Sequence, residues 1–393
     1  MSKLNFCLPV HISPEQFLTE YWQKKPLLIK QGLPHLAGMF EPEDILGLSL
    51  DDNATARLIT QHRTDSGDQW RLQQSPLTED MFSELPEQWT VLVQNLEQWS
   101  PELGQLWHAF NFIPQWQRDD IMVSYAPTGG SVGKHYDDYD VFLAQGYGHR
   151  RWQLGKYCNE TTEFIPDQPI RIFDDMGEII LDEILEPGDV LYVPPKLSHY
   201  GVAQDDCLTF SFGFRRPNLM QILDSLVDIG TTDASLFVPL LLEQKLQPAG
   251  KLERSSIAQI KQQLLAMLQS EKGDSLVEQA VSEVVSKREY ELLTPEETIS
   301  LDDLEQALQQ GGVLRTDYSS RLIYTQLQLD KTKTPVIYAN GQRLDDITAT
   351  EAELLRRLAD GESLTAEDIL NVHAVPLDIV MDWLENSWVW LDI

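Results

Sequence analysis

Between Ile121 and Phe214 the chain alternates short runs of β-branched and aromatic residues with turns made of Gly, Pro and Asp. This texture is typical of antiparallel strands. A doubly wound parallel sheet would need a helix between successive strands, and the intervals here are too short for one. The segment therefore predicts an antiparallel barrel or jelly roll. The expected strands span residues 121–125, 139–144, 150–154, 178–181, 190–193 and 208–214.

The residues before this β-rich segment predict mixed helices and strands. Ser13-Pro14-Glu15-Gln16 places a capping Ser before a Pro that suits the first helical turn, so we expect a helix to about Trp22. A short strand is expected at Lys25–Ile29. With the barrel they form a first domain over residues 1–217, whose barrel core spans about 100–217.

Residues 218–290 have a helical pattern. Ile257, Ile260, Leu264 and Met267 lie three, four and three positions apart behind a Ser256-x-x-Gln259 capping box, which predicts one apolar helix face. Such a face can pack within the chain or against a second copy, and the pattern does not separate the two. We expect a helical dimerisation region and a homodimer.

Residues 291–393 resemble a winged helix. An Asn340-Gly341 hairpin is followed by helix starts at Thr350 and Thr365, a helix after Pro376 and a strand at Trp388–Ile393. Many winged helices bind DNA, but residues 301–393 hold seven basic and seventeen acidic residues. A role in protein contacts or in structure is therefore expected for this acidic domain.

The whole chain is acidic, with 30 Lys and Arg against 62 Asp and Glu and a net charge of −32. Because phosphate binding depends on clustered cations, a nucleic-acid partner is not expected. The acidity serves solubility, or it steers a basic protein toward the surface. Three scattered cysteines predict neither a disulfide framework nor a thiolate zinc site. No apolar run reaches the roughly 18 residues that span a bilayer, so no membrane contact and a cytoplasmic location are expected.

A Gly-rich stretch from Gly129 to Gly133 leads to His135 and Asp137. On a strand these two side chains project from the same face and can hold one divalent metal. His199, which follows a Pro-Gly-Asp turn, an apolar run and Pro194-Pro195, is the expected third ligand. An isolated His-x-Asp pair would more often be a surface feature, but this ordered set predicts a facial triad with open positions, typical of non-haem Fe(II) oxygenases.

A triad of this kind leaves room for a bidentate keto acid and O2. The far carboxylate of 2-oxoglutarate needs a cation, and the forked guanidinium of Arg suits it better than Lys. Two candidates, Arg150 and Arg151, begin the next expected strand. Alternation places Arg150 with Trp152 on one face and Arg151 on the other. We choose Arg150 as the residue that faces the barrel.

The residues quoted above resemble the JmjC-type ribosomal oxygenases. The likeness rests on the stretch from His135 to Gly146, on Arg150-Arg151-Trp152, and on the run from Pro187 to His199. It extends to Tyr21-Trp22-Gln23-Lys24-Lys25-Pro26 and to Gly213-Phe214-Arg215. The resemblance is specific over residues 13–217 and looser beyond them.

The overall layout resembles the bacterial ribosomal-protein arginine hydroxylases. The resemblance implies an α+β chain with a double-stranded β-helix of the cupin type. It implies that His135, Asp137 and His199 are the catalytic metal ligands for Fe(II), and that Arg150 and Ser124 bind 2-oxoglutarate. The implied substrate is an arginine of ribosomal protein sixteen of the large subunit, hydroxylated at its β-carbon. Two alternatives stay open: a JmjC oxygenase for another residue, as a histidyl hydroxylase or lysine demethylase, and a non-catalytic cupin that binds ribosomes.

Overall fold

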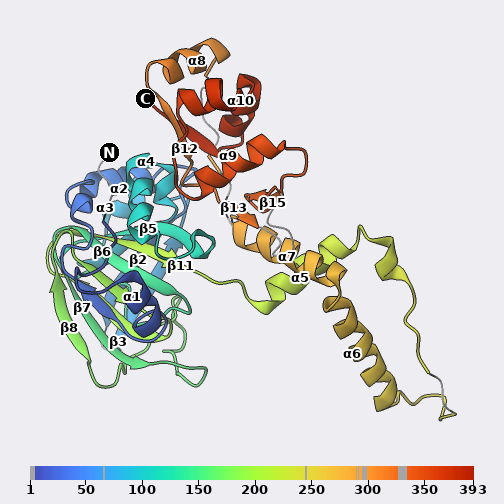
Figure 1. Ribbon diagram of the computed structural model, residues 1–393. Helices are drawn as coiled ribbons and strands as arrows, with labels where there is room; N and C mark the ends of the chain where they lie inside the picture. Colours follow the sequence, from blue (N-terminus) through green and yellow to red (C-terminus); the bar gives the residue numbers. More distant parts are fainter. Residues whose placement is uncertain are drawn as a thin grey trace. The chain divides into compact units, whose positions relative to one another are not determined.

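The structure, a computed structural model, describes residues 5–64, 67–243, 246–288, 290, 292–293, 299–325 and 334–393. The chain divides into two compact units, Met1–Arg215 and Arg216–Ile393 (Figure 1). Each unit has its own sheets, and we describe each by itself. The expected division of the second unit into residues 218–290 and 291–393 remains a prediction.

The first unit contains two antiparallel sheets. The larger has eight strands in the order β1-β9-β6-β11-β5-β4-β2-β3, and the smaller has three in the order β10-β7-β8. Their bounds are β1 Leu27–Ile29, β2 Ala56–Thr64, β3 Gly67–Gln74, β4 Gln88–Val93, β5 Arg118–Ala126, β6 Asp140–Tyr147, β7 Arg150–Tyr157, β8 Leu181–Leu185, β9 Val190–Val193, β10 Leu197–Ala203 and β11 Cys207–Phe214.

These two sheets confirm the expected double-stranded β-helix. Strand β9 has the expected bounds, whereas β8 begins three residues later than the expected 178. Strand β10 was missed, because Pro194-Pro195 before it and Gly201 within it interrupt the β pattern that a sequence search relies on. Strand β10 carries His199, the expected third metal ligand, so the strand that the sequence analysis missed is one that positions a candidate ligand.

Apolar side chains of the five strands from β6 to β10 fill the space inside this β structure. The buried members are Val141, Leu143, Trp152, Leu154, Leu185, Leu191, Val193 and Leu197. A second, aromatic layer joins the N-terminal segment to the large sheet: Phe17 of α1 lies 5.0 Å from Tyr192 and 5.8 Å from Phe142, measured between ring centroids. Edge-to-face and tilted rings at these distances add to the burial of apolar area.

The α-helices in the described part of this unit are short: α1 Pro14–Glu20, α2 Pro42–Ser49, α3 Glu79–Ser83 and α4 Pro101–Gly104. Helix α1 begins as expected, with the Ser13 hydroxyl accepting from the Gln16 amide at 3.1 Å. It ends at Glu20 rather than at Trp22. Strand β1 occupies only the last part of the expected Lys25–Ile29 run.

The second unit combines helices with two small sheets, β12-β16 and β13-β14-β15. Asn340 and Gly341 have φ angles of 50° and 85° and form the expected hairpin turn. The elements are α5 Leu219–Gly230, α6 Arg254–Leu268, α7 Glu271–Ser286, α8 Leu301–Gln309, β12 Val313–Thr316, β13 Leu322–Thr325, β14 Val336–Ala339, β15 Gln342–Arg343, α9 Ala349–Ala359, a π-helix at Glu367–Val372, α10 Leu377–Glu385 and β16 Val389–Asp392.

Two expected helix starts in this unit were wrong. Helix α6 begins at Arg254 with Glu253 as its N-cap, so Ser256 lies inside the first turn. Helix α9 begins after Thr348, whose hydroxyl accepts from the Glu351 amide in a complete capping box, instead of after Thr350. In a Thr-rich stretch several positions satisfy the capping pattern, and tertiary packing selects one.

No described helix is both long enough and apolar enough to cross a membrane.

Candidate metal centre

His135 and His199 are held together by backbone hydrogen bonds. The His135 amide donates to the His199 carbonyl at 3.1 Å, and the His199 amide donates to the His135 carbonyl at 2.9 Å. The Lys196 amide donates to the Asp137 carbonyl at 2.7 Å, so the segment 135–137 runs beside 196–199. We expected His135 and Asp137 on a regular strand. They lie instead in the connection before β6, where His135 forms one isolated bridge.

The side chains of His135, Asp137 and His199 converge. Their candidate ligand atoms all lie within 4.8 Å of one another. The two imidazole centroids are 4.2 Å apart, and Nε2 of His199 lies 3.5 Å from Oδ2 of Asp137. His199 is buried, whereas the Asp137 side chain keeps 23% of its surface exposed. One side of the cluster is therefore open to a ligand.

Each histidine is oriented by the backbone two residues before it. Nδ1 of His135 lies 3.0 Å from the Gly133 carbonyl, and Nδ1 of His199 lies 3.0 Å from the Leu197 carbonyl. A carbonyl can only accept, so Nδ1 carries the proton in both rings and Nε2 keeps its lone pair. The pair of ring nitrogens and one carboxylate oxygen fits a divalent cation such as Fe(II).

Electrostatics keep His199 neutral. Burial and the neighbouring His135 lower the pKa of His199 to about 4, although Asp137 and the Leu197 carbonyl oppose the shift. A neutral imidazole is the form that binds a metal.

The two arginines at the start of β7 differ as the alternation predicted. Arg150 is 2% exposed, and its Nη2 donates weakly to Sγ of Cys207 at 3.5 Å. Nε of Arg150 is buried and has no acceptor among the described residues. Arg151 is exposed and is paired with Asp182 through a hydrogen bond of 2.6 Å from Nε to Oδ1. Of these two arginines, Arg150 is the one that is buried and has no carboxylate partner among the described residues.

Ser124 lies on β5, buried at 6% exposure. Its hydroxyl donates to the Thr209 carbonyl at 3.4 Å, across the β5–β11 pair. To donate to a carboxylate it would have to turn away from that carbonyl. Its part in binding 2-oxoglutarate stays a prediction.

Asp120 was missed in the sequence. It lies on β5 four residues before Ser124, so alternation places both on one face, and this spacing was the available signal. Its Oδ2 is buried and has no hydrogen-bond partner among the described residues. Burial and the adjacent Asp119 raise the pKa of Asp120 to about 6, while Arg215 opposes the shift.

Tyr139 lies near enough to Asp120 and to Asp137 for both charges to act on its hydroxyl. Burial, then the charges of Asp137, Asp120 and Asp119, raises the pKa of Tyr139, and Arg215 opposes the shift. The guanidinium carbon of Arg215 lies 4.8 Å from the centre of the Tyr139 ring. Arg215 is also paired with Asp119. The Arg215 guanidinium is thus held between the Tyr139 ring and the Asp119 carboxylate.

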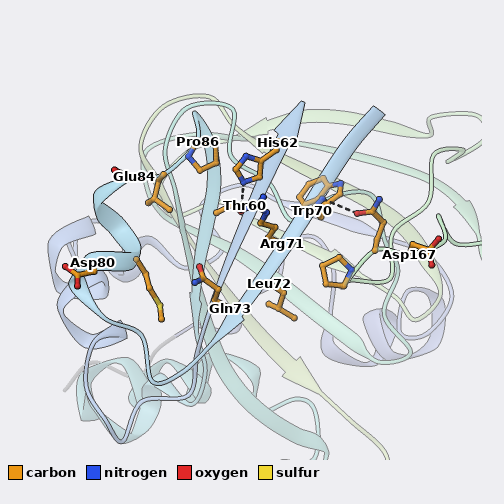
Figure 2. Close-up of a pocket in the computed structure, with 14 residues that line it drawn as sticks. Thr60, His62, Trp70, Arg71, Leu72, Gln73, Asp80, Glu84, Pro86 and Asp167 are labelled. Carbon is orange, nitrogen blue, oxygen red and sulfur yellow. Dashed lines mark hydrogen bonds between the residues drawn. The ribbon is translucent and has the colours of Figure 1, made fainter. Parts of the chain in front are cut away.

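A separate pocket of about 800 Å³ lies on the β2–β3 hairpin. Figure 2 shows Asp80 and Glu84 on one side of it and Asp167 on the other, with Arg71 and Trp70 between them. None of the three candidate ligands lines it. Trp70, which lines this pocket, also lies near the segment before His135, since a Cβ built on Gly133 would lie 3.4 Å from its ring.

Comparisons with known proteins agree with this geometry. Residues 105–222 match the JmjC domain, and residues 262–389 match a ROXA-like winged helix. A probable ribosomal oxygenase of Haemophilus influenzae is 51% identical, covering 100% of this chain and 99% of that protein. The ribosomal protein uL16 3-hydroxylase of Escherichia coli is 30% identical over 95% of this chain and 96% of its own length.

The fold agrees as well. The structure of YcfD, a ribosomal oxygenase from Escherichia coli in complex with cobalt and 2-oxoglutarate, has a TM-score of 0.76 and 27% identity, covering 97% of this chain and 98% of that one. Another structure of Escherichia coli YcfD reaches a TM-score of 0.79. The JmjC and winged-helix matches, and relatives aligned over nearly their full length, lead to one conclusion. The chain belongs to the JmjC-domain ribosomal oxygenases.

Proposed function

We propose that this chain is an Fe(II)- and 2-oxoglutarate-dependent protein hydroxylase that acts on an arginine of a large-subunit ribosomal protein. The observation that carries the proposal is the convergence of His135, Asp137 and His199 beside a buried arginine that lacks an anion. The name of the Escherichia coli relative, ribosomal protein uL16 3-hydroxylase, supports uL16 as the substrate and the β-carbon as the position. Such a substrate would be met in the cytoplasm.

His135, Asp137 and His199 would hold the iron through two Nε2 atoms and one carboxylate oxygen. This set supplies one negative charge against the two positive charges of Fe(II), and it leaves coordination positions for the keto acid and O2. The cobalt and 2-oxoglutarate named for the YcfD structure support both ligands. When bound, iron, 2-oxoglutarate and O2 supply the oxidant for an unactivated C–H bond.

Arg150 would pair with the far carboxylate of 2-oxoglutarate. Its guanidinium is buried and fixed on β7, and its Nε lacks an acceptor. A buried cation without an anion is costly, so ligand binding removes a penalty that the free protein carries. This is the expected design of a site that selects a dicarboxylate.

Asp120 and Tyr139 support arginine as the target side chain. The Asp120 carboxyl accepts hydrogen bonds from the Asn95 backbone and the Gln94 side chain, but its buried Oδ2 has no partner among the described residues. A guanidinium could donate to that oxygen. Arg215, which lies over the Tyr139 ring and is paired with Asp119, supports the view that this neighbourhood accommodates a guanidinium. A substrate arginine held this way would place its guanidinium at Asp120. Its β-carbon would lie at the other end of the side chain, next to the substrate's own backbone. The chain's task is to keep that carbon at the metal and to exclude water.

The net charge of −32 supports a basic substrate, because an acidic surface attracts the cationic proteins of the ribosome. We also infer that residues 218–290 form a homodimer. Helix α6 has no buried residue, and Ile257 and Leu264 of its apolar face are 50% and 51% exposed. Burial within the described part of the chain therefore does not account for that face.

The test is mass spectrometry of ribosomal proteins from cells that lack the gene, complemented with wild type or with Asp137→Ala. We expect one extra oxygen on one arginine peptide of uL16 with wild type and none with the variant. The complementary measurement is iron-dependent conversion of 2-oxoglutarate to succinate by the purified protein. An extra oxygen on histidine, or loss of methyl groups from lysine, would favour the alternative substrates. No turnover of 2-oxoglutarate would favour a non-catalytic binding module.

A further inference from the structure

Trp152 has a buried indole N–H with nothing to bind. Its side chain is 4% exposed, and Nε1 has no acceptor among the described residues. Buried donors in folded proteins nearly always have a partner, and an orphan donor costs about 1–3 kcal/mol. This donor lies in the middle of the barrel, so its missing acceptor is expected to be a bound molecule.

The position of the ring narrows the choice of acceptor. On β7 the inward side chains are Arg150, Trp152 and Leu154, and β10 presents Ala203, Gly201 and His199 opposite them. The Trp152 ring centroid is 5.9 Å from that of His199, and the Arg150 guanidinium carbon is 6.0 Å from the Trp152 ring. The indole therefore lies between the metal ligand and the buried cation.

Gly201 allows the ring to occupy this position. A Cβ built on Gly201 would lie only 2.7 to 2.9 Å from three carbons of the Trp152 six-membered ring. The indole thus packs directly on the β10 backbone, where any larger residue would displace it. A bulky ring fixed in this way is a rigid wall for a ligand that extends from His199 to Arg150.

We propose that Trp152 binds 2-oxoglutarate, its indole N–H donating to the far carboxylate that Arg150 holds. The inference rests on the proposed function. A five-carbon diacid chelating the iron at one end would pass along the indole and end at the guanidinium. Two donors of different geometry on one carboxylate would favour a dicarboxylate over keto acids that lack the second carboxylate. Trp152 is in this view a binding residue.

The test is calorimetric titration of 2-oxoglutarate into the Co(II)-loaded protein, which binds without turning over. Trp152→Phe keeps an aromatic ring and removes the indole N–H together with part of the ring volume, and the second ligand described below separates these two effects. We expect its Kd for 2-oxoglutarate to rise about ten- to a hundredfold, the range for one hydrogen bond to a charged group. Its affinity for Co(II) alone should not change. Trp390→Phe, which removes another buried orphan indole N–H in the second unit, is the matched control and should bind as wild type.

A second ligand identifies the carboxylate. 2-Oxopentanoate lacks the far carboxylate, so Trp152→Phe should bind it as wild type does. Equal losses for both ligands, or no loss for either, would overturn the assignment. If wild type itself does not bind 2-oxoglutarate, the proposed function fails and this inference fails with it. Should Trp152→Phe not fold, indole ¹H–¹⁵N spectra of the Zn(II)-loaded wild type provide the readout. The indole signal that Co(II) broadens most should move with 2-oxoglutarate but not with 2-oxopentanoate, and a signal that stays unmoved overturns the proposal.

Discussion

Asp137 and His199, which lie far apart in the sequence, approach to 3.5 Å between Oδ2 and Nε2. The approach does not depend on these side chains, because backbone hydrogen bonds join segment 135–137 to segment 196–199. The backbone scaffold thus brings these ligands together. Replacing a ligand should therefore damage the chemistry and leave the fold intact.

Asp137→Asn tests this separation. The amide keeps the shape but is a neutral, weaker donor, so bound iron and 2-oxoglutarate turnover should both fall at least tenfold. The thermal midpoint of the metal-free protein should stay within about 2 °C of wild type, because surface changes rarely exceed about 0.5 kcal/mol. Asp138→Asn, at an exposed neighbour, is the control. Wild-type iron content and hydroxylation in Asp137→Asn would show that Asp137 is no ligand.

Arg150→Ala should weaken 2-oxoglutarate binding strongly while metal affinity changes little. The substitution removes a charge-assisted pair, worth about 1.5–3 kcal/mol, but removes no metal ligand. Arg151→Ala breaks only an exposed pair with Asp182 and should leave the requirement for 2-oxoglutarate unchanged. The measurement is the KM for 2-oxoglutarate, with the Kd for Co(II) beside it. If Arg151→Ala raised the KM for 2-oxoglutarate and Arg150→Ala did not, the choice of Arg150 as the residue that binds 2-oxoglutarate would be wrong.

The β architecture and the phase of β7 could be predicted from the sequence because both follow from the two-residue period of a strand. Arg150, Arg151 and Trp152 lie as that period requires. The same rule would have identified Asp120 from Ser124, had the expected strand, which began at Ile121, been extended back by one residue. Strand ends are the weakest part of such a prediction, since they depend on neighbours that the local pattern does not contain.

Other features could not be obtained from local patterns. The bridge between His135 and His199 is a long-range pairing, and the register shift between Leu197 and His199 is set by the partner strand β7. Likewise, the orphan state of the Trp152 N–H depends on atoms of several strands and has no signature in the sequence. Patterns in the sequence identify candidate site residues. The packed structure is needed to show which of these residues have no hydrogen-bond partner.

Tyr192→Phe should destabilise the first unit. The buried hydroxyl donates to Oδ1 of Asp140 at 2.6 Å and accepts from the Gln23 amide at 2.7 Å. Removing it takes one hydrogen bond from each of these groups, at a cost of about 1–3 kcal/mol in the free energy of unfolding. Tyr157→Phe is the control, because that hydroxyl binds the Lys24 carbonyl from a side chain that is 49% exposed. Urea unfolding that gives equal midpoints for the two variants would contradict the role assigned to this network.

Substitutions on α5 should produce a monomer if the helical region forms a dimer. Met220 and Val227 are seven positions apart on one helix face and are 70% and 66% exposed. Glutamate at both positions would place charge in the apolar interface, which is costly without partners. Light scattering at micromolar concentration should give twice the chain mass for wild type and one chain mass for the variant. Val372→Glu, at a position 63% exposed in the second unit, should stay dimeric. A monomeric wild type would show that this prediction is wrong.

Asp120 should make substrate binding depend on pH. Burial and Asp119 raise its pKa to about 6, with Arg215 opposing, so the carboxylate is ionised at pH 7 and mostly protonated at pH 5. A guanidinium pairs with the ionised form, and the KM for the protein substrate should therefore rise roughly tenfold between pH 7 and pH 5. The KM for 2-oxoglutarate should not follow this change. Asp120→Asn should have a high KM for the protein substrate that is flat across the same range.

Stability gives an independent check on the same group. A carboxyl whose pKa is higher in the folded protein than the ordinary 3.8 favours folding below about pH 4, and that contribution is lost as pH rises through about 6. Asp120→Asn, which cannot ionise, should therefore gain stability relative to wild type at pH 8 but not at pH 4. Urea unfolding at the two pH values measures the difference. A variant whose stability relative to wild type is the same at both would mean that Asp120 does not carry the raised pKa, and its role as the guanidinium partner would then need another physical basis.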